Sequence, residues 1–252
     1  MVESPPLAPT VAAVTLAPRE ALHAVAGAGF QHVQMSATLA GLRPRDLDRS
    51  GRRDLMALLR RLELSPAGLD FLIPPGHYVD PVRADRAAGT VIAAIDLAAD
   101  LGRIPVTIEL PPTITQGDSA AGHVGVLGAI LKHAERAGVL VATLGDATTN
   151  TDGLAVAIDI ATVAMRGVAP AAALAAVRHD LASVRCSGVT GTGARVPFGR
   201  NGRVDPLELQ VALSIAGYRD AVVLDARGWP NVIVGLKESA AAWSSAAPFR
   251  IG

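Results

Sequence analysis

The chain has 252 residues and a mass of 25.8 kDa, a length that suits one large α/β domain or two small domains. Half of its residues are hydrophobic and only 18% are charged, which excludes an intrinsically disordered chain. The 23 basic and 23 acidic residues cancel, so the overall charge gives no sign of a nucleic acid or an anionic membrane as partner.

Cysteine content and the N-terminal residues bear on the cellular compartment. The single cysteine, Cys186, cannot form an internal disulfide, which is typical of a protein in a reducing compartment. The N-terminus lacks a basic start followed by an apolar run, and no apolar stretch reaches the ~18 residues needed to span a bilayer. We therefore expect a cytoplasmic protein that binds no membrane.

A repeated pattern marks the strands: an alanine-rich helical stretch ends at a glycine, and a short β-branched run follows. The glycines are Gly29, Gly102, Gly138 and Gly217. A glycine just past a helix end adopts the left-handed conformation, and the run after it is typical of a strand buried on both faces. With the apolar runs between these units, the sequence predicts eight strands, which are Val11–Thr15, His32–Met35, Ser65–Phe71, Pro105–Ile108, Val139–Val141, Leu154–Ile158, Leu181–Cys186 and Ala221–Leu224.

Helices are predicted between these strands by apolar residues at helical spacing, and an aspartate followed by a proline marks two helix starts, at Asp80 and Asp205. Only nine residues, 145–153, separate the fifth and sixth strands, so the fifth helix is predicted to be missing or shortened. The exposed flanks of these strands would favour a homodimer contact there, whereas the Thr and Asn residues of the connection favour a solvated surface.

The order of these elements predicts the fold. Eight strands that alternate with helices in about 250 residues are typical of a (β/α)8 TIM barrel, here a single domain over residues 1–252. The alternative is a doubly wound open sheet, which often has a glycine-rich phosphate loop after its first strand. Residues 15–20 occupy that place and contain no glycine.

Polar residues at the ends of apolar strands are the candidate site residues, because the chemistry of such barrels lies at the carboxyl ends of the strands. We predict four catalytic residues, which are Glu109, Asp159, Arg185 and Asp225. We predict four substrate-binding residues, two at strand ends and two in adjoining loops, which are Gln34, Asp70, His77 and Arg227.

Each of these residues also has a purely structural interpretation. Asp159 could accept hydrogen bonds from backbone amides at a loop start, and Asp225 could form a local ion pair with Arg227. Arg185 interrupts an apolar strand and must have a partner, for which Asp159 on the neighbouring strand is the natural candidate. Glu109 could be a solvated loop acid that serves no base role, and His77 an exposed loop residue.

Two further sequence features bear on the site. The glycine-rich run Gly188–Gly193, with the nearby arginines Arg195, Arg200 and Arg203, is a weak candidate for a phosphate loop or a lid. Cys186 lies inside a strand with no histidine nearby in sequence, so we expect it to be buried and inert rather than a nucleophile.

Several segments resemble the xylose isomerase-like TIM barrels, a superfamily that includes sugar phosphate isomerases and epimerases. They lie in order along nearly the whole chain and are residues 21–35 (ALHAVAGAGFQHVQM), 93–102 (AAIDLAADLG), 155–159 (AVAID) and the ending 197–205 (PFGRNGRVD) through Gly217 and Tyr218. The resemblance implies the barrel fold and a small sugar-like substrate.

The resemblance also implies a divalent metal, but most of the residues that bind it in the family are replaced in this sequence. Members hold the metal with Glu, Asp, His and Glu at strands five to eight, where this chain has Leu144, Asp159, Arg185 and Asp225. Thr162 stands where the family often has a histidine. Because an arginine repels a cation, we expect no tightly bound metal and no other cofactor, unless Glu109 or Asp146 supplies a new ligand.

Two functions follow as hypotheses. The first is a sugar isomerase or epimerase that acts on a small polyhydroxylated or phosphorylated substrate by proton transfer without a tightly bound metal. The second is a catalytically degenerate barrel that serves as a binding or scaffolding protein. A lyase or hydrolase that has reused the site is a weaker third.

Overall fold

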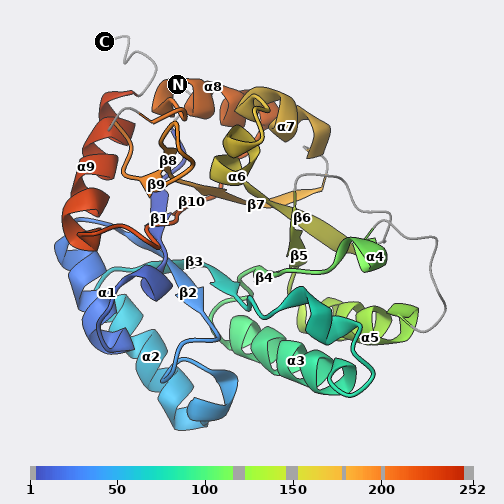
Figure 1. Ribbon diagram of the computed structural model, residues 1–252. Coiled ribbons are helices and arrows are strands. Elements are labelled where there is room, and N and C mark those ends of the chain that lie inside the picture. Colours follow the sequence, from blue (N-terminus) through green and yellow to red (C-terminus); the bar gives the residue numbers. More distant parts are fainter. Residues whose placement is uncertain (1–3, 116–122, 146–152, 178–179, 200–201, 247–252) are drawn as a thin grey trace.

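The computed structural model describes residues 4–115, 123–145, 153–177, 180–199 and 202–246, and its eight long-range strands form a ring (Figure 1). Every neighbouring pair in the order β1-β10-β7-β6-β5-β4-β3-β2 is parallel, and a bridge between Thr10 and Gln34 joins the two ends of this order. The strands are β1 Leu7–Pro9, β2 His32–Ser36, β3 Ser65–Asp70, β4 Val106–Ile108, β5 Val141–Leu144, β6 Leu154–Asp159, β7 Leu181–Cys186 and β10 Val222–Leu224. The predicted (β/α)8 barrel is confirmed.

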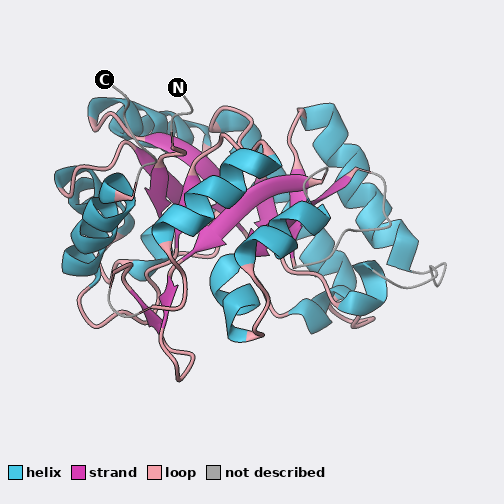
Figure 2. Ribbon diagram, turned by 90° about the horizontal axis from the view of Figure 1, so that it is seen from above, coloured by secondary structure: helices cyan, strands magenta, loops and turns pink. Residues whose placement is uncertain are grey.

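Helices cover the outside of this ring (Figures 1 and 2). None of them, within the described ranges, is long and apolar enough to cross a membrane. The predicted loss of the fifth helix, and the dimer contact that it would favour, concern residues 146–152, which lie outside the described residues. The α-helices are α1 Pro18–Gly27, α2 Arg49–Arg61, α3 Ala84–Asp100, α4 Pro112–Thr115, α5 His123–Ala137, α6 Ile160–Met165, α7 Pro170–Val177, α8 Pro206–Ala216 and α9 Val232–Ser245, and the 3-10 helices are η1 Val11–Ala13, η2 Pro44–Asp46 and η3 Pro75–Tyr78.

The first strand lies earlier in the chain than the sequence predicted. The run Val11–Thr15 is wrong as a strand: Val11–Ala13 forms the 3-10 helix η1, and β1 is Leu7–Pro9, paired with β10. Val11, Ala13 and Val14 are buried in the core beyond the strand end. The apolar run therefore predicted correctly that these side chains are buried, but it did not predict their backbone conformation.

One of the two predicted helix starts is correct. Asp205 caps α8, because its Oδ1 accepts a hydrogen bond from the backbone N–H of Leu207 at 2.7 Å. At Asp80 the prediction is wrong, since residues 81–83 form a turn and α3 begins at Ala84. The Asp80 side chain accepts from the N–H of Val82 at 2.9 Å, so the same acid stabilises a turn in place of a helix cap.

The glycines that predicted strand starts all adopt the left-handed conformation. Their φ angles are 91° at Gly29, 107° at Gly102, 65° at Gly138 and 76° at Gly217. Each glycine ends the helical stretch before it and lets the chain turn into β2, β4, β5 or β10. The helix–glycine–strand pattern was therefore a sound guide to the barrel.

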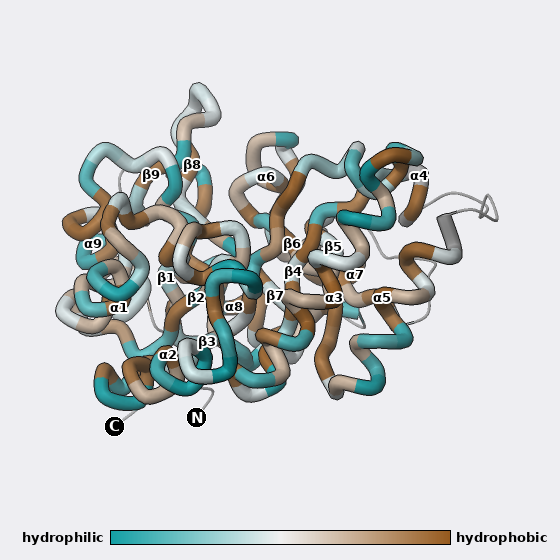
Figure 3. Tube along the Cα trace, turned by 90° about the horizontal axis from the view of Figure 1, so that it is seen from below, coloured by the Kyte–Doolittle hydropathy of each residue, from teal (hydrophilic) through white to brown (hydrophobic). Residues whose placement is uncertain are grey.

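The core has two parts. The larger part lies between the strands and the helices, and the tube is hydrophobic along much of β5 and β6 (Figure 3). The smaller part is a cluster of alanines against which Leu144 packs, made of Ala142, Ala155, Ala157 and Ala182. Register places Ala155 and Ala157 on the same face of β6 as Asp159, which points into the barrel. The interior wall on this side is therefore built from small side chains.

A two-stranded hairpin follows β7 and was not predicted. It pairs β8 Gly188–Val189 with β9 Arg195–Val196 in antiparallel fashion and projects beyond the ring of strands (Figures 2 and 3). The glycine-rich run Gly188–Gly193 forms β8 and the tip of this hairpin. No helix starts there, since α8 begins only at Pro206, so this run does not have the loop-to-helix geometry of a phosphate loop.

Candidate active site

Arg185 is buried in the barrel interior and pairs with two aspartates. Its side chain is 3% exposed. Its Nη2 donates to Asp70 Oδ2 at 2.5 Å, and its Nη1 donates to Asp225 Oδ2 at 3.2 Å. Because β3 and β7 are opposite each other in the ring, the pair of Asp70 and Arg185 crosses the barrel axis.

These residues belong to a longer chain of contacts, which we call the axial network. It consists of Gln34, Asp70, Arg185, Asp225 and Arg227. Gln34 Nε2 donates to Asp70 Oδ1 at 2.8 Å, and Arg227 donates to Asp225 through Nη2 at 2.6 Å and through Nε at 2.9 Å. The network thus runs from β2 through the barrel centre to the loop after β10, and it contains the local Asp225–Arg227 ion pair.

Asp159 is not the partner of Arg185, although the two residues are opposite each other in the register of β6 and β7. Arg195, from β9 of the hairpin, forms the ion pair with Asp159. Its Nη2 donates to Asp159 Oδ2, and its Nη1 donates to Asp159 Oδ1 at 3.3 Å. The side chain of Arg185 is long enough to reach across the barrel interior to Asp70 instead. The expected ion pair between Arg185 and Asp159 is therefore wrong.

Asp159 also caps the helix that follows it. Its Oδ1 accepts from the backbone N–H of Ala161 at 3.0 Å, and its Oδ2 accepts from Thr162 Oγ1 at 3.2 Å. Arg195 Nη1 lies 4.0 Å from Asp225 Oδ2, which joins this second cluster to the axial network. Three buried aspartates, Asp70, Asp159 and Asp225, are thus each held by an arginine.

These contacts set the ionisation of the network. Burial alone would raise the pKa of Asp225, but the hydrogen bond from Arg227 and the charge of Arg185 outweigh it and hold that pKa well below its ordinary value of 3.8. Burial opposes the charge of Arg185, yet Asp70 and Asp225 raise its pKa above the ordinary value. At neutral pH Asp225 and Arg185 are therefore both ionised.

Acidification is expected to destabilise the wild-type protein more steeply than the Asp225→Asn variant. The folded state keeps Asp225 ionised to a lower pH than the unfolded chain, which takes up its proton near pH ~4. The contribution of Asp225 is therefore complete above that pH and is lost as the pH falls through its folded-state pKa. Urea unfolding between pH about 7 and about 3 measures both slopes, and equal slopes would contradict the prediction.

Glu109 follows β4 and stands apart from these ion pairs. Register pairs Thr107 with Asp70, so Thr107 faces the interior, and Glu109, two residues later, comes to the same face at the carboxyl end. Within the described residues Glu109 forms no ion pair. Burial, and after it the charge of Glu109, raises the pKa of Tyr78, whose buried hydroxyl has no hydrogen-bond partner in the described structure. The carboxyl group of Glu109 and the hydroxyl of Tyr78 are therefore close enough to interact electrostatically.

His77 and Cys186 have structural surroundings. His77, on η3, hydrogen-bonds Arg83 through its Nε2 at 2.9 Å and forms no hydrogen bond or ion pair with the axial network among the described residues. Cys186 is fully buried, and burial raises the pKa of its thiol well above the ordinary value, which agrees with an inert role. The structure thus brings together five of the eight predicted site residues, with Asp159 joined to them through Arg195.

Arg195 and Tyr78 were not among the predicted site residues. Arg195 was noted only as a loop arginine, because nothing in its sequence position shows that the hairpin folds back onto Asp159. For Tyr78, a signal was present: an aromatic residue in the loop after β3, beside His77, has a place at the carboxyl end of the barrel.

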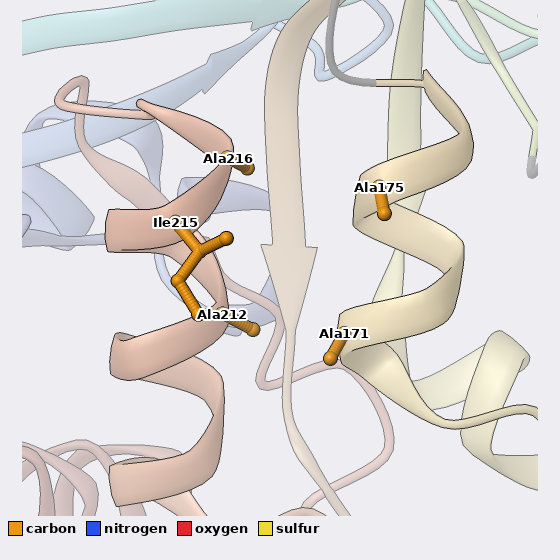
Figure 4. A pocket seen from close by; sticks show the side chains of 5 residues that line it. All are labelled: Ala171, Ala175, Ala212, Ile215 and Ala216. Carbon is orange, nitrogen blue, oxygen red and sulfur yellow. The ribbon is translucent and has the colours of Figure 1, made fainter.

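A small hollow on the outer surface lies between α7 and α8. It is lined by alanines and Ile215, has a volume of about 50 Å³, and contains no charged or hydrogen-bonding side chain (Figure 4). Ile215 is 78% exposed. A hollow of this size and character offers nothing to orient a polar ligand.

The residues that correspond to the family's metal ligands do not fit a divalent cation. Asp159 is paired with Arg195, Asp225 with Arg185 and Arg227, and Leu144 has no ligand atom. The described ranges contain no group of three or more His, Cys, Asp or Glu side chains placed to hold a metal. The guanidinium of Arg185 would repel a cation at the point where the carboxylates meet.

Comparisons with known proteins agree with this architecture. No protein-family model matches the chain, and no curated protein matches it. Among solved structures, a xylose isomerase domain protein from Planctomyces limnophilus matches with a TM-score of 0.76 at 15% identity, over 98% of each chain. A D-psicose 3-epimerase from Clostridium cellulolyticum H10, solved with D-tagatose, matches with a TM-score of 0.74 at 15% identity, over 96% of this chain and 98% of that one.

A third match concerns a metal-containing structure. A xylose isomerase-like TIM barrel protein from Mycobacterium smegmatis, in complex with magnesium, has a TM-score of 0.68 at 16% identity and covers 96% of this chain and 98% of its own. Identities this low establish the fold alone. The resemblance inferred from the sequence is therefore confirmed at this level: the chain has the fold of the xylose isomerase-like TIM barrels and sugar epimerases.

Proposed function

We propose that this protein is a sugar isomerase/epimerase-type enzyme that transfers a proton on a small polyhydroxylated or phosphorylated substrate without a resident metal. The observation that carries the proposal is the position of Arg185. Its guanidinium occupies the barrel centre between Asp70 and Asp225, at the position that the resemblance gives to a ligand histidine. A fixed positive charge thus stands in place of a divalent cation.

The arginines supply electrostatic stabilisation in this proposal. A guanidinium has five N–H donors. The hydrogen bonds to Asp70 and Asp225 leave other N–H groups of Arg185 for a substrate oxygen. Arg227 is 43% exposed and can reach a substrate at the mouth. Preorganised donors that face a developing oxyanion lower the barrier to enolisation.

Glu109 is the proposed base. Asp70, Asp159 and Asp225 are each held by arginine, whereas Glu109 forms no ion pair within the described residues. Its carboxylate takes the proton from the carbon next to the substrate carbonyl, and the electron pair moves to the carbonyl oxygen, which gives an enediolate. The same carboxyl group then returns the proton to the former carbonyl carbon. The hydroxyl proton of the first carbon passes at the same time to the former carbonyl oxygen, so that the new carbonyl forms on the first carbon. A single base suits this shift between two carbons better than inversion at one carbon, which needs proton donors on both faces.

Deuterium exchange tests the proposal without knowledge of the product. The protein, dialysed against EDTA, is incubated in D2O with the sugars named for the structural neighbours, which are D-psicose, D-tagatose, D-fructose and L-ribulose, and with their phosphate esters. We expect at least one sugar to lose the NMR signal of the proton next to its carbonyl. Exchange that requires added magnesium or manganese would contradict the metal-free mechanism.

A binding or scaffolding protein is the second candidate function. The observation in its favour is that the ion pairs satisfy the carboxylates that correspond to family ligands, so these groups need no substrate or metal to be stable. Saturable sugar binding in calorimetry without deuterium exchange in any sugar would support this candidate and contradict the enzyme.

A further inference from the structure

A second cavity lies at the opposite end of the barrel, away from the candidate active site. It has a volume of about 550 Å³, and its walls come from residues at or just before the amino ends of strands. His32 begins β2, residues 65–67 begin β3, and residues 181–183 begin β7. This volume lies within the range of pockets that bind small molecules.

The barrel interior carries smaller side chains than usual on one side. Interiors of such barrels are normally packed with layers of bulky branched side chains. Here the inward positions of β5, β6 and β7 carry Ala142, Ala155, Ala157 and Ser183, and β3 has Gly68 beside Gln34. The axial network lies above these residues, nearer the carboxyl ends of the strands.

Two polar side chains in the wall of this cavity have no hydrogen-bond partner in the described part of the chain. His32 and Ser183 line it, and neither side chain forms a hydrogen bond within the described part of the chain. Burial lowers the pKa of His32, so its imidazole is neutral at physiological pH and can both donate and accept a hydrogen bond. These groups give the inner wall polar anchors that the fold itself does not use.

Two arginines stand at opposite sides of the same opening. Arg103 precedes β4 and Arg219 precedes β10, and these strands are opposite each other in the ring. Neither guanidinium has an ion-pair partner among the described residues; Arg219 Nη1 donates only to the carbonyl of Tyr218, at 3.0 Å. Gly138 leaves room for Arg103, since a Cβ there would lie 3.3 Å from its Cδ and Nε.

We propose that this cavity is a binding site for a small organic dicarboxylate, with one carboxylate on Arg103, the other on Arg219, and the body of the molecule against the alanine and proline residues of the wall. Guanidinium groups bind carboxylates through two parallel hydrogen bonds. Asp220 also lines the opening and opposes an anion there. The site is independent of the proposed enzymatic activity, because it shares no residue with the axial network or Glu109.

Calorimetry with glutarate at low salt tests this site. We expect one glutarate to bind per chain, and uncharged pentanediol not to bind. Arg103→Gln and Arg219→Gln should each weaken glutarate binding by about five-fold or more, whereas Asp220→Asn should tighten it. All three residues are exposed, so these variants should keep the fold, which circular dichroism verifies.

Two controls locate the binding. Arg45→Gln removes an exposed arginine from η2 and should leave glutarate binding unchanged. Arg227→Gln removes an arginine from the axial network and should also leave it unchanged. Absence of glutarate binding, equal binding of pentanediol, or weakening by Arg227→Gln and not by Arg103→Gln would overturn the proposal. Ser183→Leu should abolish binding by filling the cavity, and unaltered binding in this variant would overturn it as well.

Discussion

Replacement of Arg185 by methionine is expected to lower the free energy of unfolding by about 3 to 5 kcal/mol, the usual cost of leaving a buried charge without its partner. Asp225 still has Arg227 as its partner in this variant. Most of the lost stability therefore comes from Asp70, whose remaining side-chain partner is Gln34. Urea unfolding at neutral pH, followed by circular dichroism, measures the change. The exposed control Arg45→Met should change stability by no more than about 0.5 kcal/mol.

A double variant separates this charge effect from loss of packing. Arg185→Met combined with Asp70→Asn removes both charges and keeps a partner for the Gln34 amide, so we expect it to regain much of the stability that Arg185→Met loses. It should still show no deuterium exchange, because the positive charge at the barrel centre is gone. A double variant as unstable as the single one would mean that Arg185 stabilises the barrel by packing alone.

Replacement of Glu109 by glutamine is expected to slow deuterium exchange by about 10²- to 10⁴-fold, the usual contribution of a general base. Glutamine has nearly the same shape but cannot accept the proton. Because Glu109 forms no ion pair within the described residues, the free energy of unfolding should change little. NMR of the exchanging sugar and urea unfolding provide the two measurements.

The matched control is Glu135→Gln, on the outer surface of α5, which should leave exchange at the wild-type rate. An unchanged rate in Glu109→Gln would assign the base to another group. Tyr78 is the next candidate, because its hydroxyl lies near Glu109 and has no partner in the described structure.

The barrel was predictable because its signals are local. A left-handed glycine after a helix and a β-branched run after the glycine depend on a few neighbouring residues, and Gly29, Gly102, Gly138 and Gly217 all have the expected conformation. The first strand was not predictable in this way, since the run Val11–Thr15 is as apolar as a strand. Only its position beyond the end of β1 shows that it packs as a 3-10 helix.

The positions of the polar strand-end residues were predictable, but their pairing was not. Polar residues at the ends of apolar strands predicted that Gln34, Asp70, Arg185 and Asp225 lie at one end of the ring, and the strand register places them there. It could not show that Arg185 reaches across the barrel, because a flexible side chain is not confined to its neighbouring strand. Nor could it show that Arg195 folds back onto Asp159, since this depends on how the hairpin packs.

The ion pair at the barrel centre also bears on the rate at which the barrel unfolds. Asp70 and Arg185 are 115 residues apart in the chain, and they lie on opposite strands, so they meet only when the two halves of the barrel close. Contacts between such distant residues form late, after the entropy cost of closing the intervening chain. Interactions absent from the transition state slow unfolding and leave folding almost unchanged. We therefore expect the pair across the axis to govern how long a folded barrel persists more than how quickly it assembles.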